Sequence, residues 1–189
     1  KSGAKAGKLR ATFAWIDASG SPLLEERLTM IFRDAGGLRI VDIDSTLKAL
    51  AKAEFGDDKD GAFAVRMADS LTERKTGVIT SSTGGRTMKE VWGKPANWVD
   101  YSGEVEGEKL GVAIFDHPAS FRHPARWHSR DYGLLAVNPF GTQAYDRNLP
   151  AAAVTLERGK SVRLRYRVVI HPAMEKAAIE ALYRAYVAE

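Results

Sequence analysis

The 189-residue sequence contains no cysteine, which excludes disulfide bonds, thiolate metal sites, iron–sulfur clusters and cysteine nucleophiles. No apolar run approaches the roughly 20 residues that a membrane-spanning helix needs, so no membrane partner is expected. No apolar stretch follows the basic N-terminal residues, and no signal peptide is predicted. The chain begins with lysine, which is consistent with a processed or truncated piece of a longer protein.

Three glycine-containing enzyme motifs are also missing. The sequence has no Gly-x-x-x-x-Gly-Lys phosphate loop, no Gly-x-Gly-x-x-Gly and no Gly-x-Ser-x-Gly elbow, which disfavours kinases, dinucleotide oxidoreductases and α/β-hydrolases. The charge excess is small, with 28 basic and 24 acidic residues and a net charge of +4. Nucleic-acid binders carry a denser basic stripe interleaved with aromatic residues, so no nucleic-acid partner is expected.

What the sequence does contain is mostly β-structure. In residues 161–170 apolar and arginine side chains alternate, which predicts a half-buried antiparallel strand. Further strands are predicted at residues 9–16, 27–33, 38–47, 63–68, 78–81, 98–105, 110–115 and 134–137, separated by turns rich in glycine and aspartate. Many short strands with close turns indicate an all-β fold, an antiparallel β-sandwich.

One helix and one hairpin are predicted in addition. Pro172 suits the first helical position, and Ile179, Tyr183 and Tyr186 lie on one face of the helix that follows. The turn 106–108 makes strands 98–105 and 110–115 a hairpin. We expect residues 1–8 to form a flexible basic tail and residues 9–189 a single β-sandwich domain with one C-terminal helix.

Three of the four histidines, His117, His123 and His128, lie within twelve positions between two predicted strands. Two prolines make a helix or a central strand improbable here, so the segment 116–132 is predicted to be an ordered loop. Imidazole is the commonest metal ligand in proteins, and the three rings, with Asp116 or Asp131, can hold a divalent metal such as zinc or iron. The spacing matches no established metal motif.

Two other interpretations of this segment remain open. Its guanidinium groups fit a carboxylate or a phosphate, its aromatic rings can stack on a sugar, and a histidine can act as a general base; these residues are Arg122, Arg126, Arg130, Trp127 and Tyr132. Alternatively, the segment is a rigid loop in which aspartate and arginine pair with each other and the imidazoles bind backbone carbonyls. This second alternative needs no ligand.

Two further segments carry polar and aromatic side chains. Trp92, Lys94 and Asn97 resemble a carbohydrate-binding surface, because aromatic faces contact sugar CH groups and the amide and ammonium groups bind hydroxyls. The alternative is that the tryptophan is an ordinary core residue. The segment 55–61 contains three aspartates that can hold calcium, but it lacks the EF-hand spacing, and a solvated turn fits it better.

The strings FDHPASFRHPARWHSRDYGLLAVNPFG, DSTLKAL, FGDDKDGAFAVRMADSL and KEVWGKPANWVDYSGEVEG resemble the PmoA-type domain family of bacterial proteins. The resemblance runs from about Leu23 to the final helix. It implies a fold similar to a galactose-mutarotase-like supersandwich and a soluble protein of the bacterial cytoplasm or periplasm. Family members are usually longer and carry an upstream half with its own histidine motif. The resemblance therefore implies that this chain is the C-terminal portion, and that the missing N-terminal half is a partner that can supply metal ligands.

The label of that family, methane oxygenase, implies copper chemistry, whereas the carbohydrate-degradation genes among which its members are found imply a sugar-linked role. Taking residues and resemblance together, we expect an enzyme, a lyase, epimerase or hydrolase, acting on a sugar or sugar acid at segment 116–132. The expected catalytic residues are His117, His123, His128, Arg122, Arg130 and Asp131, and the expected substrate-binding residues are Trp92, Lys94, Asn97, Trp127, Tyr132 and Arg126. The alternatives are a non-catalytic sugar-binding or structural module and, third, a copper-dependent oxygenase.

Overall fold

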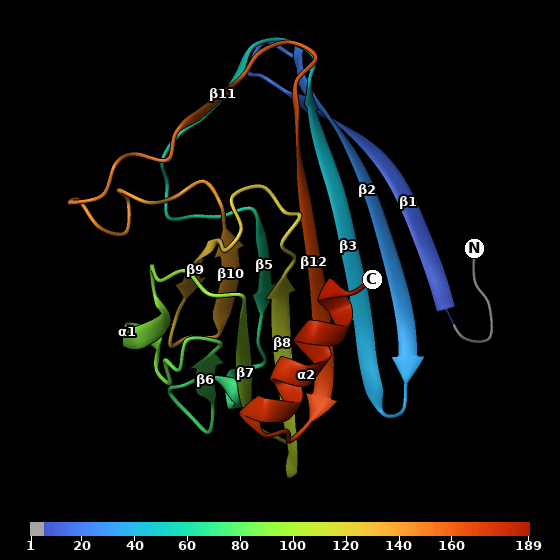
Figure 1. The fold of residues 1–189 in the computed structure, drawn as a ribbon, viewed down its shortest axis with the longest axis vertical. Helices are drawn as coiled ribbons and strands as arrows, with labels where there is room; N and C mark the ends of the chain where they lie inside the picture. The colour runs from blue at the N-terminus through green and yellow to red at the C-terminus, as the bar shows by residue number, and fades with distance from the viewer. Residues whose placement is uncertain (1–5) are drawn as a thin grey trace.

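The computed structural model describes residues 6–189 and consists of one large antiparallel sheet with a smaller sheet on one face and a helix on the other (Figure 1). Across the large sheet the strands are β1 (Ala6–Ile16), β2 (Pro22–Ala35), β3 (Leu38–Ala49), β12 (Ser161–Pro172), β8 (Glu108–Asp116), β7 (Trp98–Val105) and β6 (Val78–Ser81). The smaller sheet has the order β5 (Phe63–Arg66), β10 (Leu134–Asn138), β9 (Arg126–Ser129).

The remaining elements are short, apart from one helix. Strands β4 (Ala53–Phe55) and β11 (Val154–Leu156) pair with each other, η1 (Asp69–Leu71) and α1 (Met88–Val91) are single turns, and α2 (Lys176–Val187) ends the fold. No helix within residues 6–189 combines the length and apolar character needed to span a bilayer. The predicted antiparallel β-sandwich with a C-terminal helix is confirmed.

The two faces of the large sheet build two cores, and strand β12 shows why. Its side chains alternate, so Leu164 and Tyr166 enter the larger core beneath the small sheet, whereas Val169 packs with Phe115 against helix α2. We call the face toward the small sheet the inner face and the face toward α2 the outer face. The small sheet and the loops cover only part of the inner face, since exposed apolar side chains remain on β1 and β2.

Turn chemistry accounts for the hairpins. Glu106 and Gly107 both have positive φ angles, of 52° and 84°, at the turn between β7 and β8, which is the backbone that a tight hairpin requires. The predicted hairpin is therefore confirmed. Each predicted strand corresponds to a strand of the structure, although β1, β2 and β3 extend beyond the predicted limits.

Four sequence expectations differ from the structure. Pro172 is the last residue of β12, paired with Leu110, and α2 begins only at Lys176. The segment 116–132 is not one loop, because β9 lies within it and pairs with β10. Strands β4 and β11 and helix α1, too short for a sequence signal, were not predicted. Strand β1 begins at Ala6, so residues 6–8 of the expected tail are strand, and residues 1–5 lie outside the described part.

A buried histidine–aspartate pair ties β12 to β7 on the outer face. His171 reaches across Gly111, where any side chain would collide with the imidazole, and its Nε2 lies 2.9 Å from Asp100 Oδ1. Its Nδ1 lies 2.7 Å from the Pro172 carbonyl, so both ring nitrogens face acceptors. Burial alone would lower the pKa of His171, but the hydrogen bond and charge of Asp100 outweigh it and raise the pKa above the ordinary value.

This pair makes stability depend on pH. Because the pKa of His171 is raised in the folded state, its contribution is fully present below the unfolded pKa of about 6.5 and is lost as the pH rises through the folded value. We expect the variant His171→Gln to lose on the order of 1–2 kcal/mol at pH 6 and clearly less at pH 9. Urea unfolding of both proteins at the two pH values measures this; an equal loss at both would contradict a charged His171.

Candidate functional site

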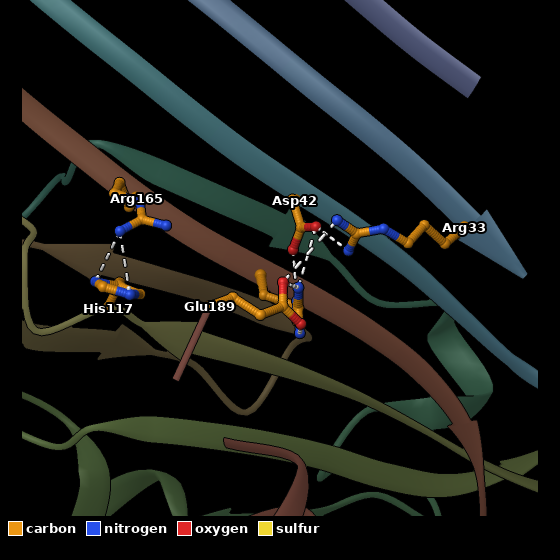
Figure 2. A network of polar contacts seen from close by, with 6 residues as sticks. Arg33, Asp42, His117, Arg165 and Glu189 are labelled. Carbon is orange, nitrogen blue, oxygen red and sulfur yellow. Dashed lines mark hydrogen bonds and ion pairs between the residues drawn. The ribbon is translucent and has the colours of Figure 1, made fainter. Parts of the chain in front are cut away.

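The three histidines of the predicted site do not converge. His117 lies on the outer face, where its Nε2 is 3.1 Å from a guanidinium nitrogen of Arg165 (Figure 2). Its ring also makes a T-shaped contact with Tyr186. Burial and then the positive charge of Arg165 lower the pKa of His117. Its Nδ1 accepts a hydrogen bond from the Ala119 backbone. This histidine therefore belongs to the packing between β12 and helix α2.

His123 is held by Asp116, a carboxylate with no exposed surface. Asp116 Oδ2 accepts hydrogen bonds from the backbone N–H of Ala125 at 2.9 Å and from His123 Nδ1 at 3.0 Å. A buried carboxylate in this position fixes the orientation of the imidazole ring. The side chain of His123 is 15% exposed, so the ring is mostly buried.

His128 lies on strand β9 and contacts the segment that precedes β5. Its Nδ1 is 2.9 Å from the Lys59 carbonyl and 3.3 Å from Asp60 Oδ1. Its ring meets the edges of Trp92 and Tyr145, with centroids 6.5 Å and 6.3 Å away. His128 and Trp92, from two separate predicted segments, are thus brought together, and Tyr145 joins them without having been predicted.

The predicted arginines bind the protein itself. Arg122 donates to the carbonyls of Pro139 and Ala152, and Arg126 donates to the Gly93 carbonyl. The guanidinium of Arg130 lies over the Tyr132 ring, 5.6 Å from its centroid. Backbone carbonyls thus take up part of the hydrogen-bonding capacity of Arg122 and Arg126, and each guanidinium ties its own segment to another part of the chain.

The other predicted residues are likewise distributed. Asp131 forms a two-pronged ion pair with Arg74, at 2.8 Å and 3.1 Å. Trp127 is fully buried and donates to the Ala96 carbonyl, and Lys94 is exposed. The Asn97 backbone is bound by Ser82 Oγ and by the Asp116 N–H. Within residues 6–189 no group of three His, Asp or Glu side chains can hold a metal ion, so the described rings assemble neither the zinc or iron site nor a copper site.

A cavity of about 420 Å³ lies elsewhere, on the inner face, where the small sheet stops and β1, β2 and β3 continue. We call it the inner-face cavity. Its walls are mainly aromatic and aliphatic: Trp15, Leu28, Met30, Ile43, Leu47, Phe55, Ala62, Phe63, Phe140, Leu164 and Tyr166, with Glu26, Ser45, Gly56, Asp58, Asp60 and Gly61. None of the predicted catalytic or substrate-binding residues lines it.

Three neighbouring strands build the polar corner of this cavity. Glu26 on β2 accepts a hydrogen bond from the Trp15 indole N–H on β1 at 3.0 Å and one from the Ser45 hydroxyl on β3 at 2.7 Å. The two carboxylate oxygens serve one donor each, so the carboxylate and the indole fix each other. The Trp15 residue nevertheless stays 45% exposed, which leaves a held aromatic ring at the mouth of the cavity.

The opposite wall comes from segment 55–63 and from Phe140. Phe55 stacks on Phe140 with ring centroids 4.6 Å apart, and Phe63 stacks on Tyr166 at 5.5 Å. A side chain on Gly61 would collide with Asn138 of β10, with a Cβ contact of 2.2 Å, so glycine lets this segment lie directly against the small sheet. The segment that the sequence predicted to be a solvated turn is thereby the rim of the cavity.

The cavity carries charge of one sign. Glu26, Asp58 and Asp60 contribute three carboxylates, and no lysine, arginine or histidine of the described chain lines it. Carboxylates accept hydrogen bonds, so the polar atoms here suit a ligand that donates them, through hydroxyl or ammonium groups. The sequence did not predict this site, because Trp15, Glu26 and Ser45 carry no signal beyond that of strand residues. They come into contact only through the register of the three strands.

Comparison with solved structures gives a weak likeness. A galactose mutarotase related enzyme from Lactobacillus acidophilus, whose X-ray structure was solved at 1.9 Å, is similar with a TM-score of 0.36 and 10% sequence identity, covering 93% of this chain and 71% of that one. The likeness concerns the fold alone. No curated protein matches the sequence. One family model matches residues 1–184, nearly the whole sequence, and its description contains no methane-oxygenase label: the chain belongs to the family of unknown function DUF6807.

Proposed function

We propose that the chain binds a neutral carbohydrate in the inner-face cavity. The observation that carries the proposal is the combination of a held, half-exposed tryptophan with hydrogen-bond acceptors and no cation in one cavity of about 420 Å³. Aromatic faces pack against the CH groups of a sugar ring, and carboxylates accept from its hydroxyls. The volume is in the range of small-molecule sites.

The same charges select among sugars. A sugar acid would bring its carboxylate beside Glu26, Asp58 and Asp60, and like charges in a partly enclosed site repel. Of the two substrates expected from the sequence, a sugar or a sugar acid, these charges favour the neutral sugar. The ammonium group of an amino sugar would instead be attracted to these carboxylates, so binding of an amino sugar is an alternative that can be measured.

Tryptophan fluorescence and calorimetric titration test the proposal. Of the four tryptophans, Trp98 and Trp127 are fully buried and Trp92 is half-buried, so Trp15 is the most exposed reporter, and loss of the signal in Trp15→Ala assigns it to this residue. We expect neutral sugars to change the tryptophan emission. Trp15→Ala should weaken binding about tenfold, because a tenfold change in affinity is about 1.4 kcal/mol, the scale of one aromatic contact. A glucuronate control should bind more weakly than glucose, and stronger binding of glucosamine would identify a cation site instead.

A second candidate uses the predicted residues. Trp92 and His128 meet edge to face beside Tyr145, and the Trp92 indole nitrogen is buried without a hydrogen-bond partner. Sugar binding at this cluster would be the function expected from the sequence. The variant Trp92→Ala separates the two: loss of sugar binding in Trp92→Ala, with full binding in Trp15→Ala, would place the site at the Trp92 cluster and reject the inner-face cavity.

A further inference from the structure

Exposed apolar side chains continue from the inner-face cavity along β1 to the edge of the sheet. Leu9, Phe13 and Trp15 alternate with polar or small residues and share the inner face, and they are 44%, 48% and 45% exposed. The strand register places Phe13 directly opposite Glu26 and Leu9 opposite Met30, both cavity residues. Strand β1 is the edge strand of the large sheet (Figure 1). Of this row only Trp15 lines the cavity, and Phe13 and Leu9 lie beside it, toward the other end of β1.

The spacing of this row fits a chain of sugar units. Side chains two residues apart on a strand lie about 6.8 Å from each other, which is the scale of one pyranose ring with its substituents. Phe13 thus offers a second aromatic platform beside that of Trp15. Ala11, the next inner-face residue, is small and leaves the surface open beyond Phe13.

A second copy of the chain fits this face less well. Two inner faces packed together would bring Glu26, Asp58 and Asp60 of one copy close to the same residues of the other. Such an interface would remove water from like-charged carboxylates, and of the three only Asp60 has a basic side chain of the described chain near it, Lys59 at 3.7 Å and His128 at 3.3 Å. A polyhydroxylated ligand instead offers hydroxyl donors to the carboxylates and its ring faces to the apolar side chains.

We infer that the site takes an extended neutral saccharide, with one unit in the cavity against Trp15 and the next over Phe13. This inference rests on the proposed carbohydrate function and specifies the substrate class as an oligosaccharide. It assigns Phe13 a role in recognising chain length, because its ring lies outside the cavity and is not among the residues that line it.

The test is a titration of the whole chain with mono-, di- and trisaccharides of glucose, xylose and mannose. We expect affinity to rise at least fivefold from one unit to two. Phe13→Ala should abolish this rise while leaving the affinity for the monosaccharide unchanged. Thr12→Ala is the control: Thr12 is exposed, precedes Phe13 in the regular part of β1 and lies on the opposite face, and the rise should persist there.

The other outcomes separate the two proposals. Equal affinity for all chain lengths, with monosaccharide binding retained, overturns the oligosaccharide inference and leaves the proposed function standing. If none of these sugars binds, the proposed function fails as well. Light scattering decides the remaining alternative: a wild-type dimer that Phe13→Ala converts to a monomer would assign this face to a second copy and overturn the inference.

Discussion

Replacing Asp42 by asparagine is expected to destabilise the fold by about 3–4 kcal/mol, because it removes the anion from a buried ion-pair network. Asp42 lies on the outer face of β3, where it accepts hydrogen bonds from Arg33 and from Arg167 (Figure 2). The Arg167 side chain is only 6% exposed and is also bound by Glu189, at 2.6 Å and 3.1 Å. Without the Asp42 carboxylate, the buried guanidinium of Arg167 keeps only the half-exposed carboxylate of Glu189 as a described ion-pair partner.

The network also explains how helix α2 is attached. Arg167 lies 4.3 Å from the centroid of the Tyr186 ring, so the same guanidinium contacts β3, the last turn of α2 and Glu189 beyond it. Loss of Asp42 should therefore loosen the C-terminal helix, and its amide protons should exchange faster in the variant. Chemical unfolding of both proteins at pH 7 measures the free-energy difference.

Asp44 provides the matched control for this prediction. It lies two residues further along β3 on the same face and pairs with Arg163 on β12. Both partners are exposed, at 36% for Asp44 and 53% for Arg163, and exposed ion pairs contribute little. Asp44→Asn should cost less than about 1 kcal/mol. If the two variants lost the same free energy, burial of Arg167 would not be the source of the Asp42 effect.

The β-sandwich could be predicted because its strands carry local signals. The alternation of apolar and arginine side chains in β12 indicates a half-buried strand, and the turn at Glu106 and Gly107 indicates the hairpin. Pro172 was misread as a helix start because proline also suits the end of a strand, where its missing N–H is not needed. Strand β9 was missed because Trp127, His128 and Ser129 are all buried, which removes the alternation by which a half-exposed strand is recognised.

The site was harder to predict than the fold, for a physical reason. A cluster of His117, His123 and His128 in sequence indicates a site only if the rings share one face, and here they point to the outer face, to Asp116 and to Lys59. Glu26 and Trp15 come together only through antiparallel pairing of β1 with β2. No spacing rule along the chain reports a contact that depends on strand register.

The rim of the inner-face cavity depends on a single carboxylate, Asp57. It accepts hydrogen bonds from the backbone N–H groups of Thr142, Gln143, Ala144 and Ala152 and from the Thr142 hydroxyl. The loop between β10 and β11 is thereby fastened to the segment that carries Asp58 and Asp60. Burial alone would raise the pKa of Asp57, but these N–H donors outweigh it and hold the pKa well below its usual range.

Asp57→Ala is therefore expected to cost about 3 kcal/mol at pH 7, since several backbone donors lose their acceptor at once. The neighbouring variant Asp58→Ala removes an exposed carboxylate whose described side-chain hydrogen bond comes from the Asp60 N–H, and it should cost less than about 1 kcal/mol. Urea unfolding of both variants and of the wild type measures these differences, and similar losses in the two variants would contradict the role given to Asp57.

The dependence of stability on pH in the acidic range gives this prediction a second test. A carboxyl group whose pKa is lowered in the folded state stabilises the fold above its unfolded pKa, about 3.9, and loses that contribution as the pH falls toward the folded value. The stability difference between wild type and Asp57→Ala should be full at pH 6 and shrink below pH 4. A difference that stayed constant down to pH 2.5 would show that lost packing, and not the carboxylate, accounts for the effect. Because Asp57 fastens the rim, sugar binding by the wild type should weaken over the same acidic range.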